Sequence, residues 1–117
     1  MPEFGDIDRP GQTTVLAGAP PGLDARVLAD LAVTLAERRV NEGPVILHVA
    51  RDGERMRLLE ESLAFFAPDL RILSFPAWDC LPYDRVSPHP KVTAERVGAL
   101  ALLVSSPPEL MPAIVLT

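Results

Sequence analysis

The sequence predicts an α/β fold in which a parallel sheet of about four strands is flanked by helices. Short runs rich in Val, Ile and Leu recur along the chain, and segments with a helical repeat of apolar residues lie between them. This alternation is typical of right-handed crossovers between parallel strands, with helices on the faces of the sheet. The predicted strands are residues 13–18, 44–50, 70–75 and 113–117.

Three helices are predicted between these runs, from apolar side chains at three- and four-residue spacing. In the first helix the apolar face consists of Val27, Leu28, Leu31 and Leu35. The second helix is predicted to have Asp52 as its N-cap and to end at Pro68. Its apolar face consists of Met56, Leu59, Leu63 and Phe66. The third helix runs from about Pro90 to Val104, and its inward-facing residues are predicted to be Val97, Leu100 and Val104.

Length and composition indicate one soluble globular domain. The chain has 117 residues, of which 48% are hydrophobic and 23% are charged. The net charge of −5, with no basic run longer than Arg38–Arg39, argues against binding of DNA or RNA by this chain. The single cysteine excludes an intramolecular disulfide, and the acidic, polar start is not a signal peptide. The longest strongly apolar run, 99–104, is too short for a membrane span, so we expect a cytoplasmic protein.

The domain boundaries follow from the first and last predicted strands. Residues 1–12 are expected to be a flexible N-terminal segment, and residues 13–117 to form the α/β domain. Thr117 is the last residue of a predicted strand, where the next turn and helix of such a fold would be needed to cover the sheet. We therefore expect a truncated fragment of a longer protein, incomplete at its C-terminal end.

The segment "AGAPPGLDAR", here called the first turn (residues 17–26), has the position of a phosphate-binding loop without its chemistry. Such a loop requires G-x-x-x-x-G-K-S/T, because the glycine-rich backbone wraps the phosphates, the lysine neutralises them and the hydroxyl holds magnesium. Counted from Gly18, the second glycine, lysine and hydroxyl positions are taken by Leu23, Asp24 and Ala25; counted with Gly22 as the second glycine, Leu23 takes the lysine position. The sequence therefore predicts a degenerate loop that binds no nucleotide, with Asp24 near a helix N-terminus.

The segment "FPAWDCLPYDRVSPHP", here called the proline loop (residues 75–90), gathers the only Trp, Cys and Tyr of the chain. A zinc site requires three or four ligands, whereas Cys80 and His89 are nine residues apart and His48 lies on a predicted strand. A Cys–His nucleophile pair would lack an orienting partner and an oxyanion turn. We therefore predict no metal, catalytic or cofactor-binding residue in the chain and an inert Cys80.

A structural interpretation of the proline loop is favoured instead. Four prolines stiffen it, and its apolar side chains are predicted to hold it against the sheet edge by burial; these are Trp78, Leu81, Tyr83 and Val86. Its charged side chains are expected to face water or pair locally; these are Asp79, Asp84 and Arg85. A sequence does not distinguish burial of Trp78 and Tyr83 in the core from their use in docking a neighbouring domain.

The proline loop and the following helix resemble a segment of bacterial transcription-repair coupling factors. In that family a run W-D/E-x-L-P-Y-D/E-x-x-S-P leads into a helix a few residues later. The matching residues are Trp78, Asp79, Leu81, Pro82, Tyr83, Asp84, Ser87 and Pro88. Residues 94–96 ("AER") lie where the family helix has a similar run. By this resemblance, residues 13–117 are similar to the first domain of excinuclease B, with a degenerate nucleotide-binding loop.

The resemblance implies a non-catalytic scaffold domain at the N-terminus of a long DNA-repair protein. The parent would be an ATP-dependent DNA translocase that displaces stalled RNA polymerase and recruits nucleotide excision repair. ATP, magnesium, DNA, RNA polymerase and excinuclease A would be bound by its other domains, so none of these is expected to be a ligand of this chain. Adjoining domains of the parent are the expected partners.

Two alternatives remain open from the residues themselves. One is a stand-alone small α/β enzyme, either nucleotide-binding or hydrolytic, that uses the proline loop and the first turn. The other is an interaction module that recruits partners by strand addition at an exposed sheet edge. The missing lysine and hydroxyl of the first turn favour the scaffold over the enzyme.

Overall fold

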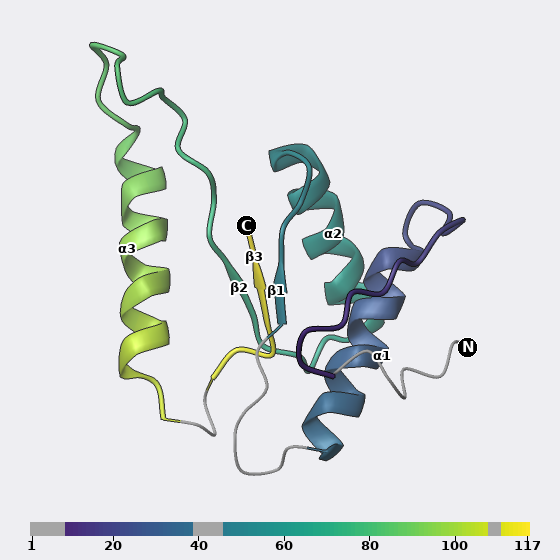
Figure 1. Ribbon diagram of the computed structural model, residues 1–117. Coiled ribbons are helices and arrows are strands. Elements are labelled where there is room, and N and C mark those ends of the chain that lie inside the picture. The colour runs from purple at the N-terminus through teal and green to yellow at the C-terminus, as the bar shows by residue number, and fades with distance from the viewer. Residues whose placement is uncertain (1–8, 39–45, 108–110) are drawn as a thin grey trace.

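A computed structural model describes residues 9–38, 46–107 and 111–117 and shows helices on both sides of a small sheet (Figure 1). The elements, in chain order, are α1 (Leu23–Arg38), β1 (Ile46–His48), α2 (Gly53–Phe66), β2 (Ile72–Ser74), α3 (Pro90–Ser105) and β3 (Ile114–Leu116). α1 and α2 pack together on one side of the strands, and α3 lies on the other side. The predicted α/β class is thereby confirmed. Among the described residues, none of the helices has the length and hydropathy needed to cross a membrane.

The sheet is parallel and has the strand order β1-β3-β2. Leu47 of β1 and Leu73 of β2 both pair with Val115 of β3. β3 is therefore the central strand, with a neighbour on each edge and helices on each face. Its residues are accordingly buried: Ile114 and Leu116 are 0% exposed, and Val115 is 6% exposed. Three strands occur within the described residues, rather than about four.

The predicted strand over residues 13–18 is wrong in this structure. The segment is irregular and exposed; Val15 is 84% exposed and Leu16 is 51% exposed. Strand-forming residues need a partner edge, and the β1 hydrogen bonds found here, through Ile46, His48 and Ala50, all lead to β3 or its flanking residues. The other three predicted strands are present but shorter. Residues 44–45 of one of them, and residues 1–8 of the predicted flexible segment, lie outside the described residues.

Alanines, rather than the predicted leucines and valine, form the most buried line of α1. Ala25, Ala29 and Ala32 are between 0% and 5% exposed, whereas Leu28 is only partly buried against the same cluster. Small side chains allow α1 to approach its neighbours closely, since the distance between packed helices depends on the side chains at the contact. The larger residues that were predicted to form the apolar face are partly buried and lie at the margin of this contact.

The prediction for α2 is confirmed in most respects. Asp52 is its N-cap, since one carboxylate oxygen accepts a 2.8 Å hydrogen bond from the Arg55 amide. Leu59 and Leu63 are buried in the core, at 3% and 0% exposed. The helix ends at Phe66, two residues before Pro68, as expected. Phe66 itself is 44% exposed, so its predicted inward orientation is wrong.

The predicted bounds of α3 are confirmed to within one residue, but its predicted inward face is wrong. Val97, Leu100 and Val104 are 60%, 51% and 87% exposed, whereas Ala99 is 2% exposed. No charged residue occurs from Val97 to Ser105, so apolar spacing alone does not determine which side of this helix faces the sheet.

Candidate functional site

The first turn is built by its prolines and glycines as a tight turn. The Leu23 amide donates a 3.1 Å hydrogen bond to the Pro20 carbonyl, which closes a four-residue turn ahead of α1. Gly22, the third residue of that turn, has a φ of 91°, a conformation that side chains disfavour. Proline in the second position followed by glycine in the third is typical of a type II turn. The Pro20–Leu23 sequence thus has a local structural reason that does not involve phosphate.

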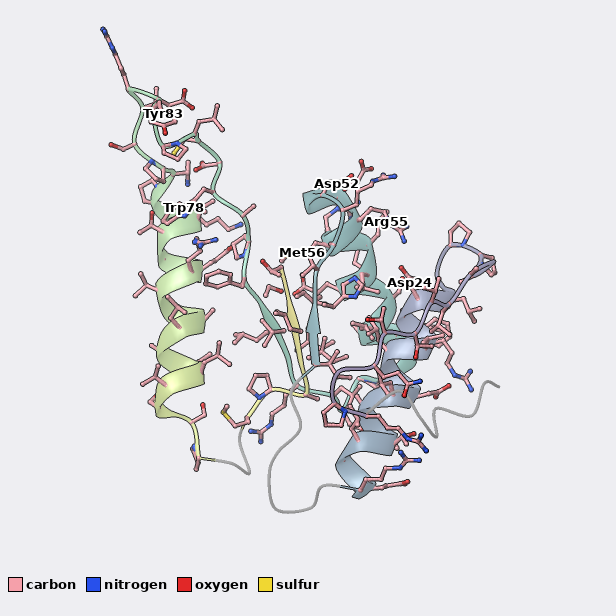
Figure 2. All side chains as sticks on the ribbon, in the orientation of Figure 1. Asp24, Asp52, Arg55, Met56, Trp78 and Tyr83 are labelled. Atoms are coloured by element: carbon pink, nitrogen blue, oxygen red, sulfur yellow. The ribbon has the colours of Figure 1, made fainter. Side chains whose placement is uncertain are left out.

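The carboxylate of Asp24 is occupied by partners within the chain. One oxygen accepts a 2.9 Å hydrogen bond from the Ala25 amide, and the other pairs with Arg55 Nη2 at 2.8 Å. Figure 2 shows Asp24 and Arg55 directed toward one another from α1 and α2. Both side chains are about one-third exposed, at 32% for Asp24 and 36% for Arg55. The predicted position of Asp24 in the first turn of α1 is confirmed, and its pairing with Arg55 was not predicted.

A pocket of about 430 Å³ adjoins this ion pair. Its lining residues come from the first turn and from the start of α2: Ala19, Pro20, Pro21, Asp24, Arg51 and Arg55. The second arginine of the pocket is also paired, because Arg51 Nε lies 3.0 Å from Asp52 Oδ2. Both arginines of the pocket are therefore paired with a carboxylate, Arg55 with Asp24 and Arg51 with Asp52.

His48 lies near the same group at the end of β1. Partial burial lowers the pKa of His48, the positive charge of Arg55 lowers it further, and the negative charge of Asp24 opposes them. At neutral pH the imidazole is therefore expected to be uncharged. The arrangement combines a neutral imidazole with ion-paired side chains, and it presents no unpaired arginine in the pocket.

The proline loop is not held by burial of its apolar side chains, so that prediction is wrong. The exposed fractions are 49% for Trp78, 69% for Leu81, 95% for Tyr83 and 72% for Val86. In Figure 2 the loop extends beyond the sheet, with Tyr83 near its tip. The prolines do exclude a regular helix, as expected, since the loop has no helical residue before Pro90.

Arg96 of α3 holds the base of the proline loop instead. Its guanidinium carbon lies 4.0 Å from the centroid of the Phe75 ring and 4.4 Å from that of the Trp78 ring. Its Nη1 donates a 2.6 Å hydrogen bond to the Pro76 carbonyl. One planar cation thus stacks with two aromatic rings and also binds the backbone between them. Sequence reasoning missed this residue, although an arginine close to the apolar part of the third helix was the available signal.

The carboxylates of the proline loop are used locally, as expected. Asp84 accepts a 2.8 Å hydrogen bond from the Leu81 amide, and Asp79 accepts one of 3.1 Å from the His89 amide. Partial burial raises the pKa of the Cys80 thiol, and the negative charges of Asp79 and Asp84 raise it further. A raised pKa disfavours the thiolate, which is the nucleophilic form of cysteine.

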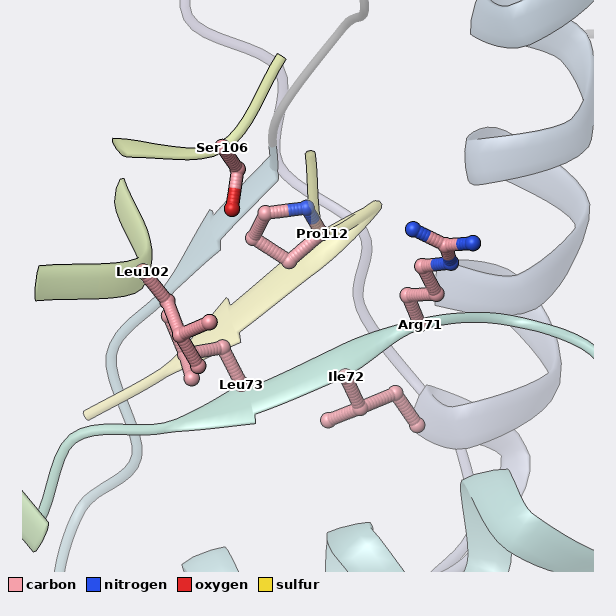
Figure 3. A pocket seen from close by; sticks show the side chains of 6 residues that line it. All are labelled: Arg71, Ile72, Leu73, Leu102, Ser106 and Pro112. Carbon is pink, nitrogen blue, oxygen red and sulfur yellow. The ribbon is translucent and has the colours of Figure 1, made fainter. Parts of the chain in front are cut away.

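Two further cavities lie away from the Asp24–Arg55 pair. A pocket of about 440 Å³ lies along the loop, lined by Trp78, Cys80, Leu81, Pro82, Asp84, Val86, Ser87 and Pro88. Another, of about 220 Å³, lies between β2 and the end of α3; Figure 3 shows its mostly aliphatic lining of Arg71, Ile72, Leu73, Leu102, Ser106 and Pro112. Within the described residues, no three His, Cys, Asp or Glu side chains are grouped as a metal site would require.

The chain is similar to transcription-repair-coupling factors from several bacteria. It is 32% identical over 78 residues to that of Escherichia coli (strain K12), which is 67% of this chain. It is 33% identical over 61 residues to that of Rickettsia prowazekii (strain Madrid E), and 27% identical over 92 residues to that of Haemophilus influenzae, which are 52% and 79% of this chain.

These similarities have a limited extent. The matched stretches make up 5% to 7% of the relatives' own length. No family model matches the chain, and no solved structure matches it. The chain is therefore related to a short part of transcription-repair-coupling factors.

Proposed function

We propose that this chain is a non-catalytic scaffold domain at the N-terminus of a transcription-repair coupling factor. In the parent protein, ATP hydrolysis, DNA translocation and contacts with RNA polymerase and excinuclease A belong to other domains. The scaffold is cytoplasmic and similar in fold to the first domain of excinuclease B. The similarity to coupling factors over 52% to 79% of the chain supports this assignment.

The Asp24–Arg55 pair carries the proposal that the domain is non-catalytic. In a working phosphate loop, backbone amides at a helix N-terminus and a cationic side chain bind the phosphate. Here a carboxylate of the chain accepts hydrogen bonds from donors of both kinds, the Ala25 amide and the Arg55 guanidinium. A nucleotide phosphate would have to displace this carboxylate, and the Asp24 charge would repel it. The ion pair thus supports a structural role for the turn, as a link between α1 and α2.

Calorimetric titration of ATP with magnesium into the chain tests this proposal. We expect no binding in the micromolar range, for the wild type and for Arg55→Ala alike. Inorganic pyrophosphate, which lacks the base and sugar, should likewise give no heat of binding. Micromolar binding of ATP that is lost in Arg55→Ala would contradict the proposal, because it would mean that Arg55 leaves Asp24 to bind phosphate.

A further inference from the structure

We draw no further inference here: the strongest candidate, the outward side of α3 with its exposed Val97, Leu100 and Val104, carries none, because nothing in the structure shows what covers it and α2 also exposes Phe65 and Phe66.

Discussion

Arg96→Ala should destabilise the chain more than any other single arginine substitution described above, because Arg96 joins α3 to the proline loop. The guanidinium stacks on Phe75 at 4.0 Å and on Trp78 at 4.4 Å, and each contact at a partly exposed site contributes about 0.5–1 kcal/mol. The hydrogen bond to the Pro76 carbonyl involves a charged donor and adds about 1.5 kcal/mol, the lower end of the range for such bonds. The expected loss is therefore roughly 2–3 kcal/mol, since neighbouring contacts are not fully additive.

Urea unfolding measured by far-UV circular dichroism provides the free energy of unfolding for this test. Arg57→Ala is the control, because Arg57 is also a helical arginine and its ion pair is with the exposed Glu61, a contact worth about 0.3–0.5 kcal/mol. Arg96→Lys keeps the charge and loses the planar stacking, so it should recover less than half of the loss. A cycle with Trp78→Ala should show a coupling energy of about 0.5–1 kcal/mol between the two side chains. If Arg96→Ala costs no more than Arg57→Ala, or if Arg96→Lys equals the wild type, the stacking argument is refuted.

Three further predictions concern single residues. Burial lowers the pKa of His48 below its ordinary value of 6.5, so the unfolded state binds more protons than the folded state near that pH, and the free energy of unfolding should fall as the pH drops through 6.5. His48→Gln should reduce this dependence on pH, as measured by urea unfolding at several pH values. An unchanged dependence would contradict the reasoning. Cys80, whose thiol pKa is raised, should react with iodoacetamide at neutral pH more slowly than free cysteine does, and faster alkylation would indicate an activated thiol. The free energy of unfolding of the Cys80→Ser variant should be the same with and without a chelator. Tyr83→Ala should change the free energy of unfolding by less than about 0.5 kcal/mol, whereas Leu63→Ala, at a position that is 0% exposed, should cost about 2–5 kcal/mol. If the two substitutions cost similar amounts in thermal or urea unfolding, Tyr83 is buried after all.

The elements that the sequence predicted correctly are those with a local signal. Asp52 begins α2 because its side chain binds a helix amide three residues later, and Pro68 lies just beyond the helix end because it cannot continue a helix. Helix bounds therefore follow from residues close in sequence. The predicted strand 13–18 had only its composition as support, and composition does not specify the partner edge that a strand requires.

The prediction of which side of a helix faces the sheet was wrong for α3, where both sides of the helix are apolar. Two sets of α3 residues follow a helical repeat equally well, and they differ in that the second contains an arginine. The first set is Val97, Leu100 and Val104, and the second is Val92, Arg96, Ala99 and Leu103. The structure turns the second set inward, because Arg96 can stack with Phe75 and Trp78 only from that side. The predicted inward face was the first set, and the prediction gave Arg96 no contact. Long-range contacts of this kind join residues about twenty positions apart and have no periodic signature.

The two candidate sites share a physical feature that relates them to the proposed scaffold role. Arg55 is paired with Asp24, and Arg96 is stacked between two rings and bound to a carbonyl. In a nucleotide- or DNA-binding protein, arginines at such positions would be available to phosphates. Here both guanidinium groups join one segment of the chain to another: α2 to the first turn, and α3 to the proline loop. Apolar side chains are exposed on α3 and on the proline loop, among them Val104 at 87% and Val86 at 72%. Both guanidinium groups thus serve contacts within the chain, which agrees with the proposed non-catalytic role.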